Sequence, residues 1–357
     1  MRQLLPVRLI HIPLQNNLPD VNKINIAQIE SVKKSVKIIL HKVLVIAVLL
    51  VGSFCRGQLR GTHLVGDVGL QSGSQGPPSF TLALPLYNYH ASTFIDANGD
   101  KVNAPDINTF LLGFGAIVVT NKKILGGNYG ASVLFALASS KIEGDIVPTK
   151  SSLAFSDMYI QPLQLGWKIK QADFSFGYAL YLPTGKYELG ANNNSGLGMF
   201  SNEFSAGSTL YFDQKKEWSF SSLFSYAINS AKKNTKDNSV TVGNVLTIEG
   251  GLGKTWYKPV KNNPLPMIIS AGLAYYMEFK ITDDKMKIPA LGSAVIDLSN
   301  KDRIFGLGVE ANIFIPSIKS SVDVRWLGEL GARNRTQGNS FFITLAPYIK
   351  FLEPKKK

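Results

Sequence analysis

The chain has 357 residues, of which 45% are hydrophobic and 18% charged, and it contains 32 glycines, 20 phenylalanines and 13 tyrosines. This composition is too apolar and aromatic for a disordered chain. The formal net charge is +13, but the lysines cluster at residues 232–236 and 355–357 without the interleaved aromatic residues of a nucleic-acid surface. We therefore expect a folded protein with solvated basic loops and no nucleic-acid partner.

Two further classes of protein are excluded. Beyond residue 60, no apolar run approaches the roughly 18 residues that a membrane helix needs, so a multi-helix membrane protein is ruled out. The single cysteine, Cys55, excludes a disulfide framework and a multi-cysteine metal site, and four histidines leave little for a histidine-based one. We expect no metal and no cofactor.

The N-terminal residues indicate export. Residues 32–57 have the order of a signal peptide, with basic residues, an apolar core and small residues in turn, which predicts cleavage near Gly57. Lipidation of Cys55 is the alternative, although Phe54 stands where a lipoprotein would have a small residue. Residues 1–31 have no place in such a signal. These residues are either a wrongly assigned start of the chain or a disordered extension. The alternative is a genuine extension that is anchored in the membrane.

Residues 58–79 come next, before any strand pattern begins. They are rich in Gly, Ser and Gln and contain no alternation of apolar and polar residues. Two interpretations stay open for this stretch: a plug that folds into a barrel, or a disordered lead-in.

From residue 80 to 352 the sequence alternates between apolar and polar residues in stretches separated by Gly, Asn, Asp and Lys, and this period of two predicts strands. An even count of about twelve, each long enough to cross a bilayer when tilted, predicts an all-β, antiparallel transmembrane β-barrel in the outer membrane. Residues 353–357 form a basic tail. The predicted strands are Phe80–Thr93, Asp106–Thr120, Ile124–Ser140, Leu153–Trp167, Ala172–Leu182, Gly198–Phe212, Glu217–Asn229, Val240–Trp256, Met267–Ile281, Arg303–Ile315, Ser320–Gly331 and Asn339–Phe351.

The two faces of these strands differ in kind. In the strand 172–182, Phe174, Phe176 and Leu180 share one face, while the other face is small and polar. Strands around Phe204 and Leu273 sort in the same way. A sandwich core could not hold so many carboxylates, because each costs several kcal/mol to bury unpaired. We therefore expect the apolar face to contact lipid and the polar face to line a solvated lumen.

Several stretches carry a resemblance to a known family: Tyr159–Trp167, Phe176–Tyr187, Asn194–Phe200, Glu203–Gly207 and Val242–Thr255. They resemble the phenol meta-pathway transporter family, and the likeness covers roughly residues 60–351. It implies an outer-membrane barrel of a kind often encoded with pathways that degrade aromatic compounds. It implies no particular cargo, because such families keep a fold while changing what they carry.

The polar face collects the residues that we expect to line a substrate path. Its acids, Glu329 among them, stand against few bases, chiefly Lys280 and Arg325. They form either a polar track that selects cargo or a set of paired charges that fills a narrow barrel. Tyrosines on the same face offer stacking surfaces and hydroxyl groups to an aromatic guest. The predicted lumen residues are Asp157, Tyr159, Gln161, Tyr181, Glu203, Tyr211, Glu249, Tyr276, Glu278, Glu310, Asp323 and Arg325.

Together these patterns predict a passive channel in the outer membrane of a Gram-negative bacterium, and not an enzyme. Its cargo would be a small apolar or aromatic compound, and its partners outer-membrane lipid, that solute and the barrel-assembly machinery. One alternative is a closed structural or surface-interaction barrel. The other is a barrel hydrolase of the phospholipase type, which would place His63 or His90 beside a serine and an acid.

Overall fold

The computed structural model describes residues 61–352 except 144–148, 189–190, 192, 233–238, 289–293 and 298–300. The predicted extension 1–31, the signal peptide 32–57 and the tail 353–357 lie outside the described residues. Within these ranges, no helix has the length and apolar character needed to cross a membrane.

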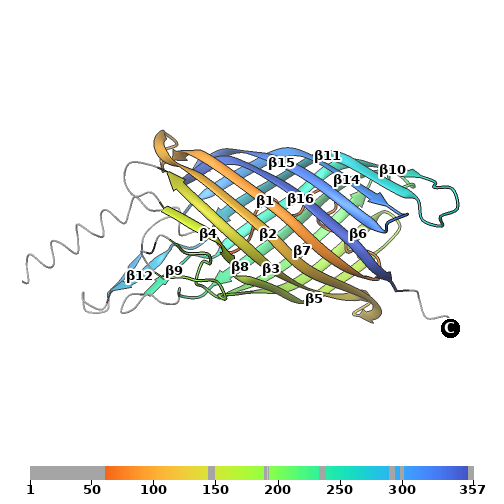
Figure 1. The fold of residues 1–357 in the computed structure, drawn as a ribbon, viewed down its shortest axis with the longest axis horizontal. Coiled ribbons are helices and arrows are strands. Elements are labelled where there is room, and N and C mark those ends of the chain that lie inside the picture. The colour runs from red at the N-terminus through yellow and green to blue at the C-terminus, as the bar shows by residue number, and fades with distance from the viewer. Residues whose placement is uncertain are drawn as a thin grey trace, which may run out of the picture. The chain divides into compact units, whose positions relative to one another are not determined.

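Thirteen strands form one antiparallel sheet in the order β2-β1-β16-β15-β14-β11-β10-β8-β7-β6-β5-β3-β4, and the pairing of β2 with β3 closes it into a barrel (Figure 1). Both β4 and β5 pair with β3, one after the other, so the wall is twelve strands around. The wall strands are β1 (Ser79–Ile95), β2 (Lys101–Ile124), β3 (Gly127–Glu143), β4 (Thr149–Phe155), β5 (Met158–Lys168), β6 (Ala172–Leu182), β7 (Ser201–Tyr211), β8 (Trp218–Asn229), β10 (Val245–Lys258), β11 (Met267–Lys280), β14 (Arg303–Ile315), β15 (Ser320–Arg333) and β16 (Arg335–Phe351).

The predicted all-β barrel of twelve strands is confirmed, and β6 and β14 have the predicted bounds. Most of the other predicted strands differ from the structure by a few residues at their ends, and two of them are interrupted. The stretch 153–167 is interrupted at Ser156 and Asp157 into β4 and β5. The stretch 240–256 is interrupted at residues 242–244, because the amide of Gly243 donates to Asp284 Oδ1 at 2.7 Å instead of joining the wall. The part before that break, β9 (Ser239–Thr241), forms a small separate sheet with β12 (Lys285–Ile288) and β13 (Ala294–Asp297).

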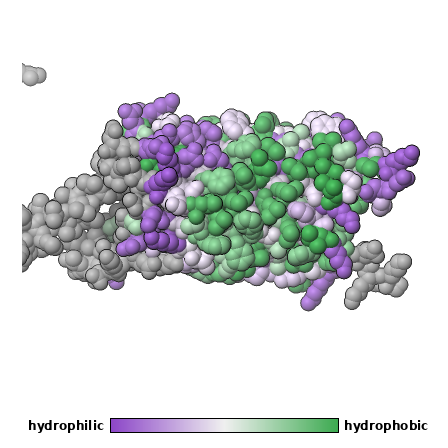
Figure 2. Space-filling view, in the orientation of Figure 1, coloured by the Kyte–Doolittle hydropathy of each residue, from purple (hydrophilic) through white to green (hydrophobic). Residues whose placement is uncertain are grey.

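Side chains alternate across the wall as the sequence predicts. The side chain of Phe176 is 38% exposed and that of its neighbour Ser175 is 8% exposed; for Leu210 and Thr209 the values are 42% and 0%. Figure 2 shows the result on one face, a hydrophobic belt around the middle of the barrel with hydrophilic residues toward both ends. The apolar side chains therefore form the outer surface, as lipid contact requires.

The connections at the two ends of the barrel differ in length. Ser79 pairs with Phe351, so the first and last wall strands begin and end at the same rim. At this rim, β2 and β3 are joined by Leu125 and Gly126 alone, both with positive φ (50° and 82°), which is the two-residue hairpin turn that suits the twist of strands. The opposite rim carries the longer connections 183–200 and 281–302. Since outer-membrane barrels place short turns toward the periplasm, the long connections face the cell exterior.

Candidate functional site

Residues 61–78, here called the lumen segment, lie against the inner face of the wall. The side chain of Leu70 packs where β10 and β11 carry glycines: a Cβ added at Gly251, Gly253 or Gly272 would lie 2.8 to 2.9 Å from its Cδ2 atom. Farther along, Gly73 lies against the backbone of Ser208 in β7. Glycines on the lumen face therefore leave the space that the segment fills.

Ion pairs and hydrogen bonds join this segment to several strands. The His63 ring lies between two carboxylates, with Nδ1 at 2.8 Å from Glu203 Oε2 and Nε2 at 2.9 Å from Glu249 Oε2. The amide of Gly66 donates to Glu249 Oε1, and that of Leu70 donates to Glu310 Oε2 at 3.0 Å. These partners belong to β7, β10 and β14, which lie along one arc of the wall, so the segment is held against that arc.

Two titratable groups of the lumen segment, which is not itself a membrane-spanning strand, have shifted pKa values. Burial lowers the pKa of His63, but Glu203 and Glu249 outweigh burial and hold it well above its usual range. Burial, followed by the charge of Glu249, raises the pKa of Asp67 to about 7. The Asp67 side chain lies deep in the barrel yet is exposed to an internal cavity that it helps to line. At neutral pH Asp67 is therefore partly protonated.

The acids of β11, β14 and β15 are paired. Arg325 Nε donates to Glu310 Oε2 at 2.8 Å and its other arm donates to Asp323 at 3.1 Å. Glu278 accepts a short hydrogen bond from Arg335, at the start of β16. The sequence indicated few bases because the last strand was predicted to begin only at Asn339, which left Arg335 out of the lumen.

Tyrosine hydroxyls complete this side of the lumen. Tyr276 donates to Glu329 Oε1 at 2.7 Å and Tyr89 donates to Glu329 Oε2 at 2.8 Å. Both rings are almost fully buried, at 1% and 3% exposed. Both hydroxyls thus stabilise the buried carboxylate of Glu329, so these two tyrosines contribute to the stability of the barrel wall.

A second group of predicted residues lies on β5, β6 and β7. The rings of Tyr159 and Tyr181 meet edge to face with centroids 5.1 Å apart, and the Tyr181 hydroxyl donates to Glu203 Oε2 at 3.4 Å. Gln161 lies near Ser132 of β3, whose hydroxyl reaches Gln161 Oε1 at 3.5 Å. Tyr211 lies apart, where its hydroxyl donates to Asp173 at 3.0 Å.

Asp157 organises the outer part of the wall. Among the described residues, β4 pairs with β3 alone and β6 ends at Leu182, so the second edge of β4 has no partner strand there. Residues 183–188 and 193–200 of the following connection lie beside that edge. Their amides at Gly185 and Leu197 donate to the two carboxylate oxygens of Asp157, at 2.9 and 2.7 Å, and Ser195 Oγ donates to the carbonyl of Phe155 at 2.7 Å.

The internal cavity has a volume of about 830 Å³. Eight of the twelve predicted lumen residues line it; Tyr211, Glu249, Tyr276 and Asp323 do not. Sequence reasoning missed its apolar wall on β1, β2, β3 and β16, because aromatic and aliphatic residues occupy both faces of these strands and polarity cannot sort them. This wall is formed by Tyr87, Tyr89, Ile107, Leu111, Leu134, Ala136 and Phe342.

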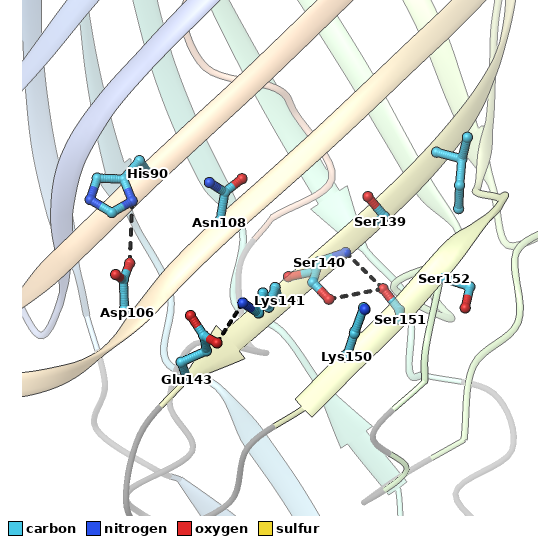
Figure 3. Close-up of a pocket in the computed structure, with 11 residues that line it drawn as sticks. His90, Asp106, Asn108, Ser139, Ser140, Lys141, Glu143, Lys150, Ser151 and Ser152 are labelled. Carbon is cyan, nitrogen blue, oxygen red and sulfur yellow. Dashed lines mark hydrogen bonds and ion pairs between the residues drawn. The ribbon is translucent and has the colours of Figure 1, made fainter.

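A second cavity, of about 420 Å³, lies among the outer ends of β1 to β4 (Figure 3). His90 Nδ1 is 3.2 Å from Asp106 there, and both side chains are about half exposed. The serine hydroxyl of Ser151 bonds to the backbone of Ser140, not to the imidazole. In the described parts of the chain, neither His63 nor His90 forms a hydrogen bond with a serine hydroxyl, so the hydrolase arrangement is not assembled at these histidines.

A closed antiparallel barrel with an apolar outer belt and a charged interior is an outer-membrane β-barrel, of the architecture that channels of this membrane use. The family model described as "Putative MetA-pathway of phenol degradation" matches residues 91–345, and the chain belongs to this family. The resemblance seen in the sequence is thereby confirmed.

Solved structures with a similar fold include the COG4313 outer membrane channel from Pseudomonas putida F1, at 13% identity, with 79% of this chain and 99% of that chain covered and a TM-score of 0.63. The β domain of the Bordetella autotransporter BrkA is 11% identical, with 75% and 99% covered and a TM-score of 0.43. The transport unit of the autotransporter AIDA-I from Escherichia coli is also 11% identical, with 84% and 96% covered and a TM-score of 0.39. A search of curated proteins finds no match.

Proposed function

We propose that the barrel is a passive channel through which a small apolar or aromatic compound enters across the outer membrane. The observation that carries this proposal is the internal cavity of about 830 Å³ with one apolar wall. An apolar cavity of about 150 Å³ holds a benzene molecule, so the space suffices for ring compounds of ordinary size. The apolar wall would replace the water that such a solute loses on entry.

The polar side of the cavity favours a neutral solute with a hydroxyl group over an anion. Gln161, Tyr159 and Tyr181 line the cavity and offer hydrogen-bonding groups. Carboxylates of Asp67 and Glu203 line it as well, and they disfavour an anionic acid. A phenol-like compound, with its ring against the apolar wall and its hydroxyl toward these side chains, matches both sides.

The lumen segment would act as a plug that narrows the path for water and ions. The hydrogen bonds of the lumen segment to β7, β10 and β14 support this role, because they hold the segment inside the barrel. In this proposal outer-membrane lipid surrounds the belt, the solute is the transported partner, and the barrel-assembly machinery inserts the chain.

A pair of neighbouring substitutions tests the proposal. Ala136 lines the cavity and is 7% exposed, whereas Phe135, the preceding residue of β3, is on the lipid side and 46% exposed. Ala136→Trp should fill part of the cavity. The rate at which an apolar naphthylamine dye enters cells with an intact outer membrane should then fall toward that of cells without the protein. Phe135→Trp, the matched control, should keep the parent rate.

Heat-modifiable migration of the barrel would verify that both variants are folded and present in equal amounts. If cells with the parent chain took up the dye no faster than cells without it, the channel proposal would be rejected in favour of the closed barrel. If folded Ala136→Trp kept the parent rate, the cavity would not be the path.

A further inference from the structure

The lumen segment and the wall bring together four side chains that are distant in the sequence. His63 and Asp67 belong to the segment, Glu249 to β10 and Glu203 to β7. One possible ligand atom from each of His63, Asp67 and Glu249 lies within 4.8 Å of the others. The cluster therefore offers one imidazole nitrogen and two carboxylates from two separate parts of the chain.

The two nitrogens of His63 have different surroundings. Nδ1 lies 2.8 Å from Glu203 Oε2, which is the carboxylate contact that fixes the tautomer and orientation of a metal-binding histidine. Nε2 points the other way, 2.9 Å from Glu249 Oε2. Asp67 and Glu249 each have a carboxylate oxygen within 4.8 Å of a ring nitrogen of His63. Metal bonds of about 2.0–2.2 Å at 90–110° separate neighbouring ligand atoms by about 2.9–3.4 Å. The spacing of Nε2 and Glu249 Oε2 falls at the lower end of this range.

The charge and access of the cluster suit a cation. Three carboxylates surround one imidazole, and Arg325, the nearest strong base, is already bonded to Glu310 and Asp323. Asp67 faces the internal cavity and, in the described chain, its side chain has no hydrogen-bond partner. Because His63 and Asp67 both line the cavity, the cluster is accessible to an ion from it.

We propose that a divalent transition-metal ion such as Zn²⁺ replaces the proton of His63 Nε2, which is released to water, and is bound by Nε2, Asp67 and Glu249, with Glu203 holding the ring through Nδ1. Mixed nitrogen and carboxylate ligands favour such an ion over Mg²⁺ or Ca²⁺, which take oxygen ligands. The bound ion would link two residues of the lumen segment, His63 and Asp67, to Glu249 of β10. This inference goes beyond the proposed transport function and does not depend on it.

To test the proposal, the purified, detergent-solubilised chain is treated with a chelator and then titrated with Zn²⁺ in a calorimeter. A second titration uses Co²⁺, whose binding is followed by its visible absorption spectrum. We expect one Zn²⁺ per chain, no competition from Mg²⁺, and a Co²⁺ spectrum with nitrogen and oxygen ligands. Asp67→Asn should weaken Zn²⁺ binding about tenfold or more, and this variant removes no ion pair of the barrel. His63→Gln should abolish binding.

His90→Gln is the matched control, because His90 also pairs with a carboxylate, Asp106, but outside the cluster. It should bind Zn²⁺ like the parent. The proposal is overturned if the parent shows no saturable Zn²⁺ binding, if folded Asp67→Asn binds like the parent, or if His90→Gln is the variant that loses the ion. Should His63→Gln fail to fold, the Asp67→Asn measurement alone decides.

Discussion

Arg325 shows how single residues neutralise the lumen. Each part of its guanidinium group has a partner: Glu310 at 2.8 Å, Asp323 at 3.1 Å and the carbonyl of Gly66 at 2.6 Å. The same side chain thus pairs two acids of the wall and holds the lumen segment. A buried charge with this many partners stabilises the fold only while all of them are present, since the loss of one leaves another uncompensated.

Replacing Glu249, Glu278 and Glu310 together with Gln tests whether these charges set ion selectivity. The substitution keeps size and hydrogen bonding but leaves His63 and two arginines with fewer countercharges. We expect the cation preference to fall and the reversal potential in a salt gradient to shift toward anions. Stability should also drop, by as much as about 3–5 kcal/mol for each fully buried pair that is broken.

The measurement compares the reversal potential of the parent and the triple variant in planar bilayers, with Asp106→Asn, an exposed site at the rim, as the control. An unchanged potential in a correctly assembled, open barrel would mean that the three carboxylates only fill the lumen structurally.

At the scale of the strand, the alternation of apolar and polar residues decides which side chains contact lipid. Side chains near the end of a strand decide where that strand stops. Asp157 interrupts the ladder between β4 and β5 and bonds instead to amides of the connection 183–200. A stretch of wall beside β4 is therefore held by side-chain-to-backbone bonds in place of strand pairing.

Cysteine labelling tests the two faces. Cysteines at Phe176 and Leu210 should react with a reagent dissolved in the lipid phase, because both side chains form part of the outer belt. A cysteine at Ser175, where the native hydroxyl is buried, should react with a small water-soluble reagent once residues 61–76 are deleted. A cysteine at Thr209, which is fully buried, should react only when residues 61–76 are deleted. Water-phase labelling of 176 and 210 with protection of 175 would reverse the assignment of faces.

Asp157→Ala should open the connection 183–200. Two hydrogen bonds to a charged carboxylate are lost, each worth about 1.5–3 kcal/mol, so cleavage of this connection by a protease added outside the cell should become at least about tenfold faster. Asp213→Ala is the control, since Asp213 accepts amides of the turn between β7 and β8 at the other rim. Equal protection of the connection in parent and Asp157→Ala would contradict its role.

At the scale of the molecule, the barrel encloses part of its own chain. The lumen segment runs from Gly61, which lies against Val245 near the outer rim, to Ser74, which bonds to Asp173 near the periplasmic rim. Residues 61–74 therefore occupy the lumen from one rim to the other.

Mass spectrometry of the membrane form tests the predicted processing. We expect the mature chain to begin near Gln58, because the apolar part of residues 32–57 is too short to span a bilayer and ends in small residues. Peptides from residues 1–31, or a lipid on Cys55, would contradict cleavage at this point. The same spectrum serves as its own control, because peptides of the lumen segment must be present.

The sequence by itself determined the barrel, the approximate strand bounds and the inward or outward direction of side chains on the strands whose two faces differ in polarity. The reason is local: the pleat places successive side chains on opposite faces, so polarity read two residues at a time reports the face. Only the tertiary structure decided which charges meet. His63 reaches Glu203 across 140 positions of sequence and Glu249 across 186, and no periodicity encodes contacts at such separations. The path of the lumen segment, the pairing of Arg335 and the apolar wall of the cavity depend in the same way on strands brought together by closure of the sheet.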